Sequence, residues 1–223
     1  MGIKDLYEPV QKDDYGSVKR TLDAYITAYR CGPVEWEINW KTQFAPEFRL
    51  RPAKNGSPYS PLQLLAVLRA LRYNDYFSSL SFQDIDLSIL WNYYDISAKG
   101  PDSAYINRTG VLLSPDEIDL LRMSPLLHQE FHALAFCSGT IRQIDFTNAF
   151  RALPTKCKIH SRLSVQFITP ILNLLKASIS KCSRLILSGC VLTPMDLDEL
   201  GEYKGGTWLC WFAEGRPDML TSS

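Results

Sequence analysis

The chain has 223 residues, of which 46% are hydrophobic and 22% charged, and its 24 basic and 24 acidic side chains give a formal net charge of zero. These values are ordinary for a soluble protein that buries a substantial core. The first residues lack the apolar segment of a secretory signal peptide, and the longest apolar stretch, Val165 to Leu175, is too short and too polar to span a membrane. We therefore expect a cytoplasmic protein whose six cysteines remain reduced thiols.

Residues 1–59 contain no internal repeat. Within them, residues 17–30 place apolar side chains at helical spacing, and Gly32-Pro33 ends this predicted helix. In residues 34–44, apolar side chains alternate with polar ones, which predicts a half-buried strand. Residues 45–59 carry prolines and a glycine and are predicted to be a connector. The whole region is either an α-rich N-terminal cap that shields the first repeat from water or the remainder of a separate upstream domain.

A predicted helix followed by a predicted strand forms the central unit of the chain. Ser60, Pro61 and Gln63 have the pattern of a capping box with proline at the first helical position. Leucines follow at helical spacing, and after Asn74 the apolar period changes from about four to two. Five apolar residues then match the leucine-rich repeat frame L-x-x-L-x-L-x-x-N/C-x-L: Phe77, Leu80, Phe82, Ile85 and Leu87.

The same frame recurs later in the chain. One complete copy consists of Cys182, Leu185, Leu187, Cys190 and Leu192. A degraded copy keeps Ile141, Ile144 and Phe146 but loses the pattern at Ala149 and Arg151. Another keeps Ile106, Val111 and Leu113 but has Arg108 at an apolar position. Because a single unit cannot bury its apolar face alone, we predict an α/β fold, a short leucine-rich repeat solenoid with parallel strands on the concave side and helices outside.

The repeat region is predicted to cover residues 60–200. Within it, a capping box at Ser114–Glu117 and a restart at Ser124-Pro125 predict helix up to Phe136, and a further helix is expected around residues 165–179. The segment 201–223 is predicted to be an irregular tail. Its aromatic residues either fold back as a cap, or the tail replaces missing C-terminal units of a truncated array.

Residues 69–88 resemble the start of the repeat region in ribonuclease-inhibitor-like leucine-rich repeat proteins, and most of all the CARMIL-type actin capping-protein regulators. The matching residues are Tyr73-Asn74, Tyr76-Phe77 and the segment Asp84–Ser88. The resemblance implies an arc-shaped solenoid without catalytic residues, used for protein contacts in the cytoskeleton or in signalling.

Two histidines suggest an alternative function of a different class. His128 and His132 lie one helical turn apart, as in the zinc-protease motif, but that motif needs glutamate where Gln129 stands. No third ligand occurs at a familiar spacing, so a structural or solvated pair is the interpretation we favour over a metal-dependent enzyme. Asp84 and Asp86 are interpreted as turn-forming rather than catalytic.

The charges are unevenly distributed in the second half of the chain. No acidic residue lies between Phe146 and Met195, whereas several basic ones do, among them Lys156, Lys158 and Arg162. This basic segment is a surface either for an acidic partner or anionic lipid, or for the acidic tail that follows it. Nucleic-acid binding is not expected, because no aromatic residues are interleaved with the charges.

The predicted partner site follows from the alternation of side chains along a strand. Residues between the inward-facing apolar ones should line the concave face: Ser79, Ser81, Gln83, Gln143, Asp145, Thr147, Arg184, Ile186 and Ser188. They are small, polar or of mixed charge, which suits adaptable protein contacts better than chemistry. The sequence therefore predicts a non-enzymatic protein-interaction module without a cofactor.

Overall fold

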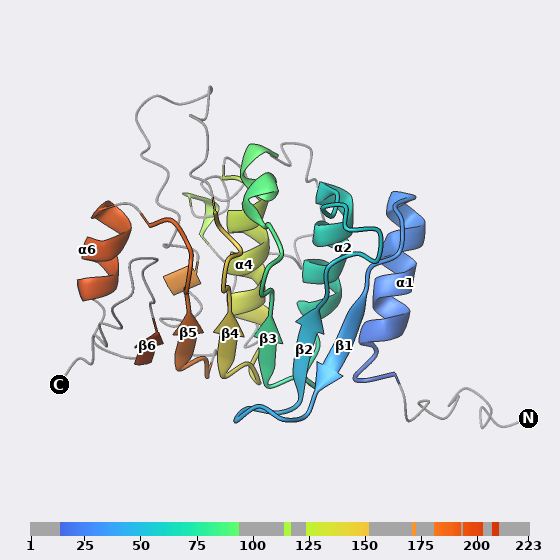
Figure 1. Ribbon diagram of the computed structural model, residues 1–223, viewed down its shortest axis with the longest axis horizontal. Coiled ribbons are helices and arrows are strands. Elements are labelled where there is room, and N and C mark those ends of the chain that lie inside the picture. The colour runs from blue at the N-terminus through green and yellow to red at the C-terminus, as the bar shows by residue number, and fades with distance from the viewer. Residues whose placement is uncertain are drawn as a thin grey trace, which may run out of the picture.

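The computed structural model describes residues 14–93, 114–116, 124–151, 171–172, 181–192, 194–202 and 207–209. These residues form one six-stranded sheet with helices along it (Figure 1). The α-helices are α1 (Val18–Tyr29), α2 (Pro61–Leu71), α4 (Leu126–Cys137) and α6 (Pro194–Glu202), and Ser88–Asn92 form a 3₁₀ helix, η1. The strands are β1 (Trp36–Asn39), β2 (Glu47–Leu50), β3 (Ser79–Ser81), β4 (Gln143–Asp145), β5 (Arg184–Ile186) and β6 (Thr207–Leu209).

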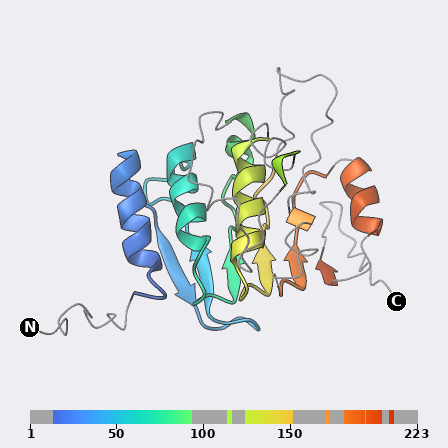
Figure 2. The same ribbon diagram turned by 180° about the vertical axis from the view of Figure 1, so that it is seen from behind.

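The order of strands in the sheet is the order of strands in the chain, from β1 to β6. Only β1 and β2 are antiparallel, and every later neighbour pair is parallel. Helices α1, α2 and α4 cover one face of the sheet, which Figure 2 shows from their side, and the strands are uncovered in the view of Figure 1. The fold is therefore mixed α/β with a mostly parallel sheet.

The predicted start of α2 is confirmed. The Ser60 hydroxyl accepts a hydrogen bond from the Gln63 backbone N–H at 3.3 Å, and the Gln63 side chain accepts one from the Ser60 N–H at 2.9 Å. These two bonds satisfy donors that the first turn of a helix otherwise leaves without partners. The predicted helices at residues 17–30 and after Ser124-Pro125 are present as α1 and α4, and the alternating segment 34–44 contains β1.

The predicted core residues of the repeat frame are buried in adjacent parallel strands. Leu80 pairs with Ile144, which pairs with Leu185, and all three face the helices with almost no exposed surface. Phe82, Phe146 and Leu187 repeat this arrangement two residues later, and the rings of Phe82 and Phe146 stack at 5.8 Å between centroids. The frame residues Leu80, Phe82, Leu185 and Leu187 thus share one core.

The same tight turn follows β3, β4 and β5. Its third residue has a left-handed backbone in each case, with φ of 63° at Asp84, 58° at Asn148 and 68° at Gly189. Each turn closes with a hydrogen bond from the next N–H to the carbonyl three residues back, as from Ile85 to Phe82. Neighbouring turns are also bonded to each other, because the N–H of Asp84 donates to Thr147 and that of Asn148 donates to Ser188, both at 2.8 Å.

The repeat frame extends further than the sequence pattern indicates. The degraded copy keeps its turn because Ala149 occupies the buried position that Ile85 has in the first copy. At Arg151 the side chain is exposed and bonds Asp84 at 3.0 Å, so an apolar residue is not needed there. The degraded copy therefore lacks large apolar side chains at these two positions but keeps the backbone geometry of the turn.

Two strands lie where none was predicted. β2 falls in the expected connector 45–59, where Phe48 and Leu50 are buried although prolines flank the strand. β6 falls in the expected irregular tail and pairs in parallel with β5. The alternation around β2 covers only residues 47–51, and β6 has three residues. Neighbouring strands supply the hydrogen bonds that stabilise both segments.

The copy at 106–113 lies outside the described residues, as does most of the helix expected at 165–179. The expectation of a repeat copy at residues 106–113 therefore stays a prediction. β3 and β4 are nevertheless hydrogen-bonded directly, with Ser79 opposite Gln143.

Replacing Leu185 by alanine should lower the free energy of unfolding by about 2–5 kcal/mol, because a buried isobutyl group is lost and a cavity remains. Urea unfolding of both proteins measures the difference. The control is Leu62→Ala in α2, whose side chain is 46% exposed and whose loss should cost little. Similar losses in the two variants would contradict the assignment of Leu185 to the core.

Replacing Gly189 by alanine tests the repeated turn. A Cβ at Gly189 would lie 2.0 Å from Oδ1 of Asn148, in addition to the strain of a positive φ. Gly56→Ala is a matched control, since Gly56 has φ of 70° and nothing lies within 4 Å of the position that a Cβ would take there. The positive φ alone costs about 1–2 kcal/mol, so thermal unfolding should show a distinctly larger loss for Gly189→Ala than for Gly56→Ala.

Candidate binding surface

The sheet face opposite α1, α2 and α4, here called the helix-free face, carries most of the predicted partner residues in aligned rows. Register places Ser79, Gln143 and Arg184 side by side in one row, and Ser81, Asp145 and Ile186 in the next. Gln83, Thr147 and Ser188 follow in the turns beyond the strands. The predicted alignment of these triplets is therefore present.

Their expected exposure is correct only in part. Gln83 is exposed, and Asp145, Thr147, Arg184, Ile186 and Ser188 are half-buried, whereas Ser79, Ser81 and Gln143 are buried. The connection between β1 and β2 contributes to this burial. Its Pro46 carbonyl accepts from the N–H groups of Ser78 and Ser79, and its Gln43 side chain accepts from Arg184 at 3.1 Å.

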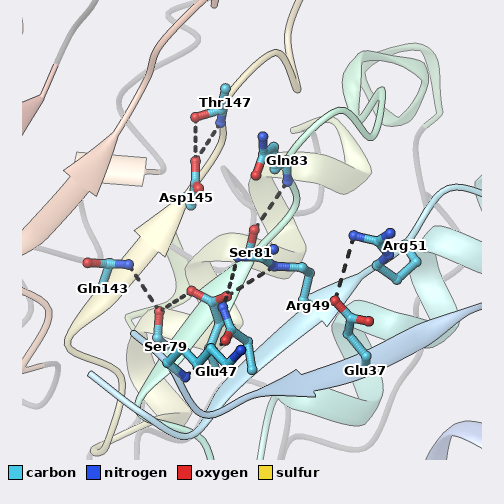
Figure 3. Close-up of polar contacts among 12 residues, drawn as sticks. Glu37, Glu47, Arg49, Arg51, Ser79, Ser81, Gln83, Gln143, Asp145 and Thr147 are labelled. Carbon is cyan, nitrogen blue, oxygen red and sulfur yellow. Dashed lines mark hydrogen bonds and ion pairs between the residues drawn. The ribbon is translucent and has the colours of Figure 1, made fainter. Parts of the chain in front are cut away.

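A buried carboxylate organises the first part of this face. Glu47 is 2% exposed, and its Oε1 accepts from Asn39 at 3.0 Å and from Nη2 of Arg49 at 2.9 Å. Its other oxygen accepts from the Ser79 hydroxyl at 3.3 Å, and Ser79 in turn accepts from the Gln143 amide at 3.3 Å. Figure 3 shows this polar network linking side chains across adjacent strands.

Sequence reasoning missed Glu47, Arg49 and Asn39. The available signal was the alternation of Glu47, Arg49 and Arg51 with Phe48 and Leu50, which is the period of a strand with one polar face. The prolines on either side obscured it, because proline normally argues against a central strand.

The acidic residues near the strand ends shape the turns. Asp145 Oδ1 accepts from the N–H and hydroxyl of Thr147 at 2.8 and 2.6 Å, and Asp86 makes the same pair of bonds with Ser88. Asp84 adopts the left-handed conformation and accepts from Asn148 at 2.8 Å. These contacts agree with the interpretation of Asp84 and Asp86 as turn-forming residues.

Within the part of the chain that the structure describes, two polar atoms at this surface are buried without a hydrogen-bond partner, Oε1 of Gln143 and Oγ1 of Thr42. Thr42 belongs to the β1–β2 connection, and Gln143 lies in the row that this connection helps to bury. A buried acceptor without a partner costs about 1–3 kcal/mol, so these two atoms lower the stability of this part of the fold.

The two histidines lie on α4, and both are half-buried. Among the residues that the structure describes, no group of three possible metal ligands occurs. Burial lowers the pKa of His128 from 6.5 to about 4, so this side chain is neutral near pH 7. The basic segment with Lys156, Lys158 and Arg162 lies outside the described residues.

On the helix side, a buried ion pair connects three helices. Glu130 on α4 accepts from Arg69 at 2.9 Å and from Arg72 at 2.6 Å, and Arg69 also bonds the hydroxyl of Tyr29 on α1 at 2.5 Å. Burial lowers the pKa of the Arg69 guanidinium, but the adjacent Glu130 carboxylate outweighs burial and raises it. The Arg69 guanidinium is therefore permanently charged, and its contacts hold α1, α2 and α4 together.

Comparison with protein-family models, curated proteins and solved structures finds no match to this chain. Within the described residues, no helix is long and apolar enough to cross a membrane. What the chain does must therefore be inferred from its own geometry.

The low pKa of His128 predicts a pH dependence of stability. Between pH 6.5 and about 4 the unfolded chain binds a proton at His128 and the folded chain does not, so stability falls as the pH falls through this window. His128→Gln should remove this contribution, and urea midpoints at pH 7 and pH 5 should then differ less in the variant than in the wild type. Equal pH slopes would show that His128 titrates alike in both states.

Proposed function

We propose that this chain is a short leucine-rich repeat solenoid that binds a protein partner through its helix-free face and has no catalytic function. The observation that carries the proposal is the alignment of the polar triplets on that face by the register of β3, β4 and β5. The same left-handed turn after each of these strands supports the repeat assignment. The likeness of residues 69–88 to the CARMIL-type repeats adds to it.

The residues of the helix-free face fall into two groups, a buried group here called the floor and a more accessible group here called the rim. Ser79, Ser81 and Gln143 form a buried polar floor. The accessible side chains are the exposed Gln83 and the half-buried Asp145, Thr147, Arg184, Ile186 and Ser188. We therefore assign direct contact with a partner to the rim, and to the floor the task of holding the rim side chains in place.

Charges on the face are balanced between acidic and basic groups. Arg49 is paired with Glu47 within the face, whereas the Arg184 guanidinium donates to the neutral amide of Gln43. A partner of mixed charge with an acidic group toward Arg184 fits this surface. Charged groups at such a rim contribute mainly to the association rate and to specificity.

The experiment identifies a partner by affinity capture with the intact chain and then measures its affinity for rim variants. Arg184→Glu and Gln83→Arg should each weaken binding by about tenfold or more, since a reversed or added charge at an interface is unfavourable and about 1.4 kcal/mol corresponds to one decade of affinity. Arg20→Glu is the matched control, because Arg20 lies on α1, and its side chain is 74% exposed.

Circular dichroism and thermal unfolding establish that each variant is folded. The proposal fails if both rim variants bind normally while substitutions at Lys156, Lys158 and Arg162 abolish binding. The basic segment would then be the site, and its ligand would be an acidic protein or an anionic lipid.

A further inference from the structure

The outer edge of β1 is the first edge of the sheet, and no described strand pairs with it. The antiparallel pairing with β2 determines which backbone N–H and C=O groups of β1 point toward β2 and which point outward. The N–H of Arg51 donates to the carbonyl of Glu35 at 2.8 Å, so Glu35 and Arg51 form a hydrogen-bonded pair. Since such pairs alternate, Glu37 with Arg49 and Asn39 with Glu47 are the next ones.

Trp36 and Ile38 lie between these pairs, and their N–H and C=O groups therefore point away from β2. Within the described residues, no backbone or side-chain hydrogen bond reaches these groups. An exposed row of this kind is a template for an additional strand. The edge is short, so an added strand would gain few backbone bonds, and side chains must supply part of the affinity.

The side chains of β1 define what an added strand should carry. Trp36 and Ile38 project toward the helix side, are half-buried and pack against the core. Glu35 and Glu37 alternate with them on the other side, and their side chains are 36% and 49% exposed. Opposite charges on directly facing strands attract each other, so basic residues facing these glutamates and apolar residues facing Trp36 and Ile38 fit the edge.

The position of α1 favours a single extended peptide over a second copy of this chain. Both ribbon views show α1 farther out than β1 at this end of the molecule (Figures 1 and 2). Two copies joined by their β1 strands would bring their α1 helices together on the same side of the continued sheet. A lone strand would instead lie against α1, which would cover its apolar side.

We propose that the edge of β1 binds, by strand addition, an extended peptide segment in which basic and apolar residues alternate. This site is separate from the helix-free face, and it does not depend on the function proposed for that face. The proposal requires that the Ile38 N–H and C=O form hydrogen bonds with the peptide backbone. It also requires that basic side chains of the peptide form ion pairs with Glu35 and Glu37. The ion pairs that these glutamates already make, with Lys54 and Arg51, are solvent-exposed, and such pairs contribute little.

The test measures binding of a synthetic peptide of about nine residues, a length typical of strands, with alternating valine and lysine. A block peptide of the same composition, with all valines before all lysines, controls for charge alone. Isothermal titration calorimetry at low salt should show at least tenfold tighter binding of the alternating peptide. Equal binding of the two peptides, or no binding of the alternating one, would overturn the proposal.

Three protein variants test the location of the site. Ile38→Pro removes an N–H that points away from β2, and proline is tolerated on an edge in that orientation, so peptide binding should fall at least tenfold. Ile38→Val keeps the N–H and should bind like the wild type. Glu35→Gln combined with Glu37→Gln should weaken binding without changing the backbone, which keeps the test valid if Ile38→Pro unfolds.

Gln83→Arg should leave peptide binding unchanged, because Gln83 follows β3 on the helix-free face and β2 separates β3 from β1. If Gln83→Arg, whose added positive charge repels the lysines, abolishes peptide binding while the Ile38 and glutamate variants bind normally, the peptide occupies the helix-free face, and the edge assignment is wrong.

Discussion

The structure depends on the stacking of one tight turn at the ends of β3, β4 and β5. Each turn directs the chain away from the sheet with a single left-handed residue, and the N–H groups of one turn donate to the carbonyls of the next. Those bonds fix the register of the short strands, which with three residues each have few ladder bonds of their own. Because register decides which side chains face the core, the turns also determine the polar face.

The helices are tied together by a different kind of contact. Glu130 is buried between Arg69 and Arg72, and the desolvation of these charges is offset only while all partners are in place. Asn74 has a similar role nearer the N-terminus, where its amide donates to the carbonyls of Tyr15 and Gly16 and its oxygen accepts from Tyr76 and Phe77. Such contacts add geometric specificity to a core that is otherwise apolar.

Features set by local sequence could be predicted, and those set by distant contacts could not. The capping box of α2 needs only residues 60–63, and the buried positions of the first and last frames follow from alternation within a few residues. The strand β2 lies between β1 and β3, and the short local alternation at residues 47–51 was outweighed in the sequence by the flanking prolines. The alignment of the polar triplets was predictable from the frame, but the burial of Ser79 and Gln143 depends on Pro46 and Gln43, which come from another segment.

The two surfaces proposed for binding differ in which groups make the contacts. On the helix-free face, the backbone is satisfied by neighbouring strands, so a partner can meet only side chains. Glu47 is already satisfied by Asn39, Arg49 and Ser79 within the fold, which leaves recognition to the rim. At the edge of β1 the backbone itself is the donor and acceptor, and the side chains only select the peptide. The interior strands of the sheet are paired on both sides, whereas β1 keeps one outer edge, so the first strand is where strand addition remains possible beside a preformed polar face.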